Sequence, residues 1–337
     1  MSHLCIYQAR TLAIALFIVA ALLGSIHDVA HAVPRWQTGD QAGAPNVSGS
    51  VVSAPDRQAV AQSIQPQAYL IILDATTSMS WNFAGQGTKN GRDVQCVPTS
   101  GPNIQRQYCG AGAPWRHIHE RRISAAKQAI RLLIDQLDSN DTMRLLAFST
   151  KGISTSQRWT SNQRRLRREL LDLGAYQHQP YRTAGEAPSA SALFTARQLL
   201  TQLPQTAPNG LPYGQPLVIF ITDSVANRFL KANGGWENRP KDTCPGIPFV
   251  DDIATCQIGF TSSNPPLPRP ITAMGLQADL LKQGATVYVI ALASVDETGL
   301  TNVASAPNYP YFSRAVRSED LLAIIQAIRV SIISSAT

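Results

Sequence analysis

The 337-residue sequence lacks the short motifs that mark the common hydrolases and nucleotide-binding enzymes. No Gly-x-Ser-x-Gly elbow surrounds Ser78 or Ser80, and there is no His-Glu-x-x-His pair. The segment 85–89, Gly-Gln-Gly-Thr-Lys, has only the first half of a phosphate-binding glycine loop. We therefore expect a protein that is not an enzyme, and a hydrolase with Ser78 or Ser80 as nucleophile is the least favoured alternative.

Charged residues are also scarce, at 15% of the chain against 44% hydrophobic residues. This balance excludes an intrinsically disordered chain and predicts a globular protein. The formal net charge of +7 favours loose attraction to anionic surfaces. A basic helix is predicted at 162–173, which we interpret as a solvated helix face, and we expect no specific nucleic-acid partner.

An apolar run from Leu12 to Leu23 follows Arg10, and the small-residue sequence Ala-His-Ala stands at 30–32. These are the three parts of a secretory signal peptide, so residues 1–32 are predicted to be one, with an uncleaved anchor as the alternative. Either way the body of the chain is exported, and we expect a periplasmic, cell-surface or secreted protein. Residues 33–66, rich in Gly, Pro, Ser and Gln, are predicted to form a flexible linker.

Cysteine is rare as well, with five in the chain, of which Cys5 lies in the predicted signal peptide. The even number that is left in an exported protein suggests two disulfides. We favour the pairs Cys96–Cys109 and Cys244–Cys256, because each pair lies within one Gly- and Pro-rich segment. A zinc site built from the four thiolates is the alternative, although neither spacing is the short Cys-x-x-Cys type.

Polar residues follow two apolar runs at the point where each run ends. Residues 69–73 and 217–222 are predicted to be strands buried on both faces of a parallel sheet. The first run is followed by Asp74, Thr76 and Ser78, the second by Asp223. Carboxylate and hydroxyl oxygens at the carboxyl edge of such a sheet would suit Mg²⁺, Mn²⁺ or Ca²⁺. The alternative is an ordinary turn rich in Ser and Thr.

Strands and helices alternate along the rest of the chain, which predicts one α/β domain at 67–332 with a mostly parallel central sheet. Two Gly- and Pro-rich segments, at about 81–116 and 224–270, are interpreted as insertions rather than elements of the fold. Further strands are predicted at 143–148, around Trp159, at 286–291 and at 311–312. Helices are predicted at 118–138, 162–173, 189–203, 271–282, 299–304 and 319–330.

Four segments in the right order resemble the von Willebrand factor A family. They are the Asp-x-Thr-x-Ser pattern at 74–78, the helix sequence at 122–129, the strand and carboxylate at 220–223, and the segment 283–290. The resemblance implies a Rossmann-like fold with helices on both faces of the sheet. It also implies a metal-ion-dependent adhesion site, in which Thr76 and Ser78 bind the ion directly and Asp74 and Asp223 bind it directly or through water.

The implied ion is Mg²⁺, or Mn²⁺ or Ca²⁺, with one position left open for an acidic group on a protein or cell-surface partner. One residue departs from the family pattern, because Ala187 stands where the family has a threonine ligand. Thr183 or Glu186 would have to substitute for it. The site is therefore expected to be partly degenerate, and a metal-independent scaffold is the alternative.

The two insertions leave the sheet at the edge that carries the expected ion, and they are rich in aromatic residues. We expect an aromatic rim that binds the partner, although the rings could instead pack small cores within the insertions. By family analogy the function would be adhesion, pilus or secretion assembly, or envelope assembly in a bacterium. The rim residues are Trp81, Phe83, Tyr108, Trp115, Phe229 and Trp236.

Overall fold

The computed structural model describes residues 65–96, 114–224, 226, 228–231, 233–237, 270–293 and 297–335. The expected signal peptide, most of the expected linker, Tyr108, Cys109, Cys244 and Cys256 lie outside these ranges, so the predictions made for them stay predictions. The domain limits predicted at 67 and 332 also stay predictions, although both residues lie within the described ranges. Within the described ranges, no helix is long and apolar enough to cross a membrane.

The core of the fold is a six-stranded sheet with the order β10-β9-β6-β1-β4-β5. All neighbouring pairs are parallel except β4 and β5, which are antiparallel. The predicted strand around Trp159 is wrong: the edge strand lies earlier, and Thr160 forms only an isolated bridge with Met143. The strands are β1 (Ala68–Asp74), β4 (Thr142–Ser149), β5 (Gly152–Thr155), β6 (Leu217–Thr222), β9 (Thr286–Leu292) and β10 (Phe312–Ala315).

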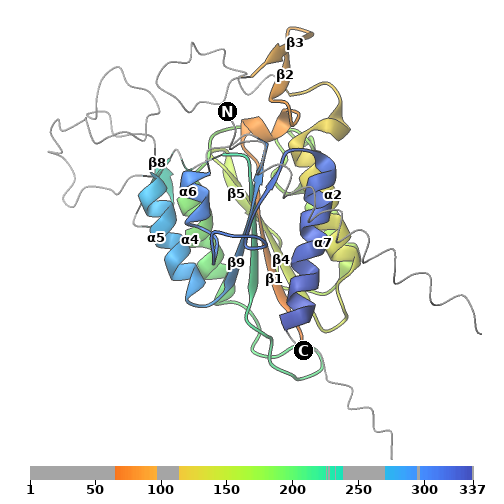
Figure 1. The fold of residues 1–337 in the computed structure, drawn as a ribbon, viewed down its shortest axis with the longest axis vertical. Coiled ribbons are helices and arrows are strands. Elements are labelled where there is room, and N and C mark those ends of the chain that lie inside the picture. The colour runs from red at the N-terminus through yellow and green to blue at the C-terminus, as the bar shows by residue number, and fades with distance from the viewer. Residues whose placement is uncertain are drawn as a thin grey trace, which may run out of the picture. The chain divides into compact units, whose positions relative to one another are not determined.

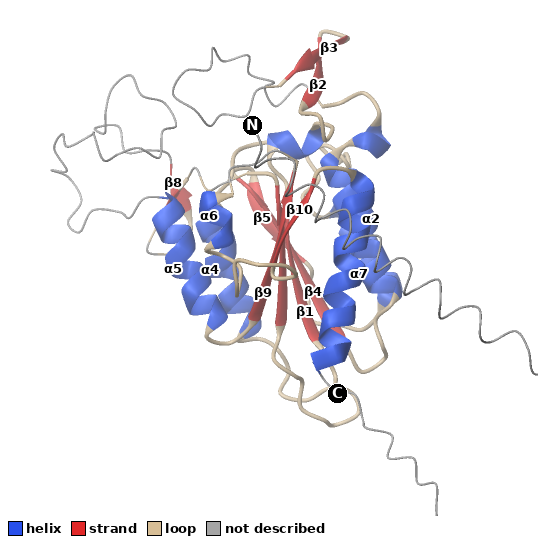
Figure 2. Cartoon of the chain, viewed as in Figure 1, coloured by secondary structure: helices blue, strands red, loops and turns tan. Residues whose placement is uncertain are grey.

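Helices cover both faces of this sheet, which confirms the predicted Rossmann-like α/β class (Figures 1 and 2). The first face is covered by α2 (Arg122–Asp135), α3 (Gln163–Asp172) and α7 (Ser318–Ser335). The second face is covered by α4 (Ser189–Leu200), α5 (Pro270–Lys282) and α6 (Thr298–Thr301).

Strand β1 lies between β4 and β6 and is fully buried along its length. Its side chains alternate, so that Tyr69, Ile71 and Leu73 join the core under α2, α3 and α7, while Leu70 and Ile72 join the core on the other face. Two apolar faces explain why this strand has an unbroken apolar sequence. The strand therefore ends, at Asp74, on the central axis of the sheet.

The insertions do contain regular structure, contrary to the prediction. Two short 3₁₀ helices, η2 (Thr77–Ser80) and η3 (Ile118–Glu120), frame a hairpin of β2 (Gln86–Lys89) and β3 (Arg92–Gln95). Asn90 and Gly91 form its turn with φ of 52° and 74°, which is the left-handed backbone that an Asn-Gly hairpin turn requires. The second insertion contains the antiparallel pair β7 (Phe229–Leu230) and β8 (Trp236–Glu237).

Gly174 brings the end of α3 into contact with the loop that follows β1. Its φ is +67°, and a Cβ placed there would lie 2.6 Å from Cβ of Ala75 and 3.1 Å from Cβ of Ala147. Only glycine therefore fits both the backbone conformation and the space. This close approach sets the position of the first residue after Asp74.

We expect Gly174→Ala to destabilise the protein more than Gly210→Ala, which is the matched control. Gly210 has a similar φ of +80°, but nothing lies within 4 Å of the point that a Cβ would occupy there. The control should cost about 1 kcal/mol for the left-handed backbone alone. Gly174→Ala should cost roughly 1–3 kcal/mol more because of the clash. Urea unfolding of both purified variants checks this, and equal losses would contradict the packing role of Gly174.

Candidate functional site

Asp74, the last residue of β1, is completely buried and accepts three hydrogen bonds. Its Oδ1 accepts from the amide of Thr76 at 2.8 Å, and its Oδ2 accepts from the hydroxyls of Thr222 at 2.6 Å and Ser224 at 2.7 Å. Burial raises the pKa of Asp74 to about 6, the charge of nearby Asp223 adds to this, and the three hydrogen bonds oppose it. The carboxyl group is thus held in place from both β1 and β6.

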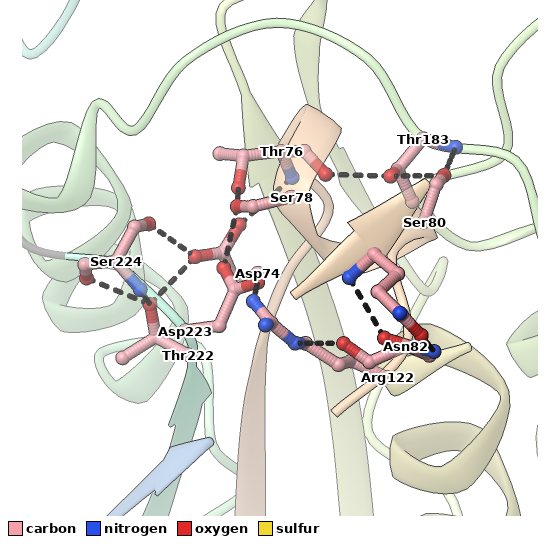
Figure 3. A network of polar contacts seen from close by, with 11 residues as sticks. Asp74, Thr76, Ser78, Ser80, Asn82, Arg122, Thr183, Thr222, Asp223 and Ser224 are labelled. Atoms are coloured by element: carbon pink, nitrogen blue, oxygen red, sulfur yellow. Dashed lines mark hydrogen bonds and ion pairs between the residues drawn. The ribbon is translucent and has the colours of Figure 1, made fainter. Parts of the chain in front are cut away.

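Asp223 follows β6 directly and lies beside the loop after β1 (Figure 3). Its Oδ1 accepts a hydrogen bond from the hydroxyl of Ser78 at 2.8 Å, and the Thr76 and Ser78 hydroxyl oxygens are 3.2 Å apart. The structure thus brings together all four residues that the sequence analysis assigned to the ion. Because β1 and β6 are neighbours and parallel, their carboxyl ends meet at one point of the sheet edge.

A fifth residue, Arg122, completes this cluster and was missed as a site residue by the sequence analysis. Its Nη1 donates to Oδ2 of Asp223 at 2.7 Å, and the exposed fractions of the two side chains are 8% and 0%. One signal for it was present in the sequence: Arg121 and Arg122 open a helix, where positive charge opposes the helix dipole. Such a placement indicates an acidic partner elsewhere in the chain.

Neither expected substitute ligand faces Asp74 and Asp223. Thr183 is buried, its hydroxyl donates to the carbonyl oxygen of Thr76 at 2.5 Å, and its amide donates to Oγ of Ser80 at 2.8 Å. Glu186 forms an ion pair with Arg228 at 2.5 Å. Ala187, at the position of the family threonine, is packed in the core on the α4 side.

The segment around Thr183 instead supports the backbone of the loop after β1. The amide and hydroxyl of Thr77 donate to the carbonyl oxygen of Gly185 at 3.0 and 3.1 Å, and the amide of Gly185 donates back to the Thr77 hydroxyl at 3.0 Å. The φ of Gly185 is +94°, and a Cβ there would lie 2.5 Å from Oγ1 of Thr150. The two loops are therefore bound to each other by direct hydrogen bonds.

The arrangement does not fit the divalent-ion site that the family resemblance implies. One of its two carboxylates already forms a buried ion pair with Arg122. A guanidinium group at this point would repel a divalent cation.

The prediction of an aromatic rim is wrong for two of its residues, Trp81 and Trp115. Trp81 and Trp115 are only 7% and 8% exposed, so their rings support the structure from inside and offer no open contact surface. Phe83 is half-buried against the core under α2, and Trp236 is half-buried. The side chain of Phe229, like Tyr108, lies outside the described part of the chain. Cys96 is disulfide-bonded, but the cysteine pairings stay predictions.

No protein-family model and no curated protein matches the chain. Among solved structures, the PilB minor pilin from Streptococcus sanguinis matches with a TM-score of 0.51 and 14% identity, over 81% of this chain and 63% of that chain. This chain thus corresponds to less than two thirds of that pilin. The likeness shows the fold alone.

Two other similar structures have lower scores. The pilus adhesin SpaC from Lactobacillus rhamnosus GG has a TM-score of 0.48 and 14% identity, over 81% of this chain and 31% of that one. Proximal thread matrix protein 1 from the mussel byssus, with zinc in its MIDAS motif, has a TM-score of 0.44 and 12% identity, over 81% of this chain and 46% of that one.

We expect Arg122→Met to lower the free energy of unfolding by about 3–5 kcal/mol, because it leaves the Asp223 carboxylate buried without a counter-charge. In a double-mutant cycle, Asp223→Asn should recover part of that loss when it is added to Arg122→Met. The control is Arg167→Met, whose ion pair with Asp135 is 41% and 35% exposed. It should cost less than about 1 kcal/mol. Similar losses for Arg122→Met and Arg167→Met would refute the special role of Arg122.

Proposed function

We propose that this chain is a non-catalytic binding module of the cell envelope, which contacts a protein or surface partner through the carboxyl edge of its sheet. The observation that carries the proposal is the gathering of loops at that edge. The loop of Asp74 and the β2–β3 hairpin follow β1, and Asp223 and the β7–β8 pair follow β6. All of them depart from two adjacent strands.

The position of these loops in the topology supports a binding role. The chain passes from β1 to β4 on one side and later returns to β6 on the other side of β1. The carboxyl end of β1 is therefore a topological switch point, where open α/β sheets bind their ligands. The tip of the β2–β3 hairpin, at residues 89–93, is exposed and so is accessible to a partner.

The internal bonding of the loop after β1 favours recognition over catalysis. The Ser78 hydroxyl donates to the Asp223 carboxylate and not to an imidazole, the base that activates most nucleophilic serines. His117 and His119 are exposed, and the contacts between their rings lie outside this cluster. A rigid scaffold that positions variable contact loops is a common design for binding sites.

The setting in the envelope rests on the expected signal peptide and on the fold shared with PilB, which is described as a minor pilin. Adhesion or pilus assembly is the form of binding that we propose. A metal-dependent form of this binding would have an acidic group of the partner complete the coordination of a bound ion. Metal-dependent binding requires a bound ion with an open coordination position, and the ion pair of Arg122 with Asp223 argues against such an ion.

Site-specific photo-crosslinking in the native host tests the binding role. A photoreactive amino acid at Lys89, at the exposed hairpin tip, should give one reproducible adduct with an envelope component. The control position is Gln205, which is also exposed but lies between α4 and β6, on the amino side of the sheet. It should give no such adduct. Absence of an adduct at Lys89, or the same adducts at both positions, would contradict the proposed binding edge.

A further inference from the structure

Three independent contacts hold the Arg122 side chain in one orientation, and Figure 3 shows its hydrogen bonds to Asp223 and Asn82. Its Nη1 donates to Asp223, its Nε donates to the carbonyl oxygen of Asn82 at 3.0 Å, and its guanidinium lies 5.8 Å from the centre of the Trp81 ring. The amide of Arg122 also donates to the carbonyl oxygen of Trp81. The first residues of the first insertion therefore hold this guanidinium against the Asp74–Asp223 cluster.

Positive charge stabilises the cluster for a simple electrostatic reason. Asp74 and Asp223 are both buried and repel each other when both are ionised, and a cation beside one of them reduces that repulsion. In the family that the sequence resembles, a divalent ion would provide that charge. In this chain the Arg122 guanidinium donates to one of the two carboxylates directly, through a single hydrogen bond from Nη1 to Oδ2 of Asp223.

The hydroxyl groups of the loop are also satisfied within the protein. Ser78 donates to Asp223, and Thr183 donates to the carbonyl oxygen of Thr76. Thr222 and Ser224 donate to Asp74. Each hydroxyl named here therefore has an acceptor for its proton within the protein, and none of these donors is left unpaired.

We propose that Arg122 is the resident cation of this site and replaces the divalent ion, so that the Asp-x-Thr-x-Ser loop keeps its shape without metal. The inference concerns the loop itself and is independent of the binding role proposed above. Its consequence is constitutive assembly: the sheet edge is formed whether or not divalent cations are present. Removal of Arg122 should then convert the cluster into one that responds to metal.

Thermal unfolding of the purified protein in chelator, and then in excess Mg²⁺ or Mn²⁺, tests this directly. The melting temperature of the parent protein should be the same in all three conditions. Arg122→Gln should melt lower in chelator, and saturating Mn²⁺ should raise its melting temperature by roughly 5 °C, because the freed carboxylates can bind the ion.

Arg121→Gln is the matched control, since Arg121 is also buried but donates to the carbonyl oxygens of Trp115 and Tyr181 instead of a carboxylate. It should be destabilised without any rescue by metal. A metal response in the parent, or equal responses of the two variants, would overturn the inference.

Calorimetric titration of Mn²⁺ into the parent protein keeps the test decisive if Arg122→Gln does not fold. Absence of binding heat supports the inference, and saturable binding that Asp223→Asn abolishes overturns it. Both measurements use the protein without a partner, so their failure is distinct from a failure to find crosslinks at Lys89.

Discussion

The compensation of two buried carboxylates is the constraint on which the rest of this sheet edge depends. Asp74 ends β1 and Asp223 directly follows the adjacent parallel strand β6, so the topology itself brings them together. The groups that compensate them are the amide of Thr76, the hydroxyls of Ser78, Thr222 and Ser224, and, for Asp223, the guanidinium of Arg122. The loops that bear these groups can adopt few other conformations without leaving a buried charge unpaired.

The first insertion has two distinct parts. Its outer part is a hairpin with an exposed tip, which is available for contact. Its first two residues, Trp81 and Asn82, lie against the guanidinium of the first residue of α2. The segment from Thr183 to Ala187 supports this loop from the other side, because it forms hydrogen bonds with the backbone of Thr76 and Thr77. Recognition by the outer hairpin would thus rest on a rigid base.

Much of the fold was predictable from the sequence, because doubly buried strands and amphipathic helices leave strong patterns. The runs that became β1, β6 and β9 and the helices that pack on them were placed within a few residues. The hairpin at 86–95 was missed although Asn90 and Gly91 form a recognisable turn, because the surrounding glycines suggested an irregular loop. The strand expected at Trp159 was misplaced, since an edge strand is held by one neighbour and its pattern is weak.

The sequence by itself determined the class of fold and the convergence of Asp74, Thr76, Ser78 and Asp223, because parallel strands must end on the same edge. Only the tertiary structure decided what that convergence means. Arg122 is separated from Asp223 by 101 positions, and no local pattern shows that the two side chains meet. In the folded chain Thr183 bonds to the backbone of Thr76 and Glu186 pairs with Arg228. Trp81 and Trp115, expected at an exposed rim, are buried. Charge pairing and side-chain direction depend on contacts between distant segments, and these arise only when the chain has folded.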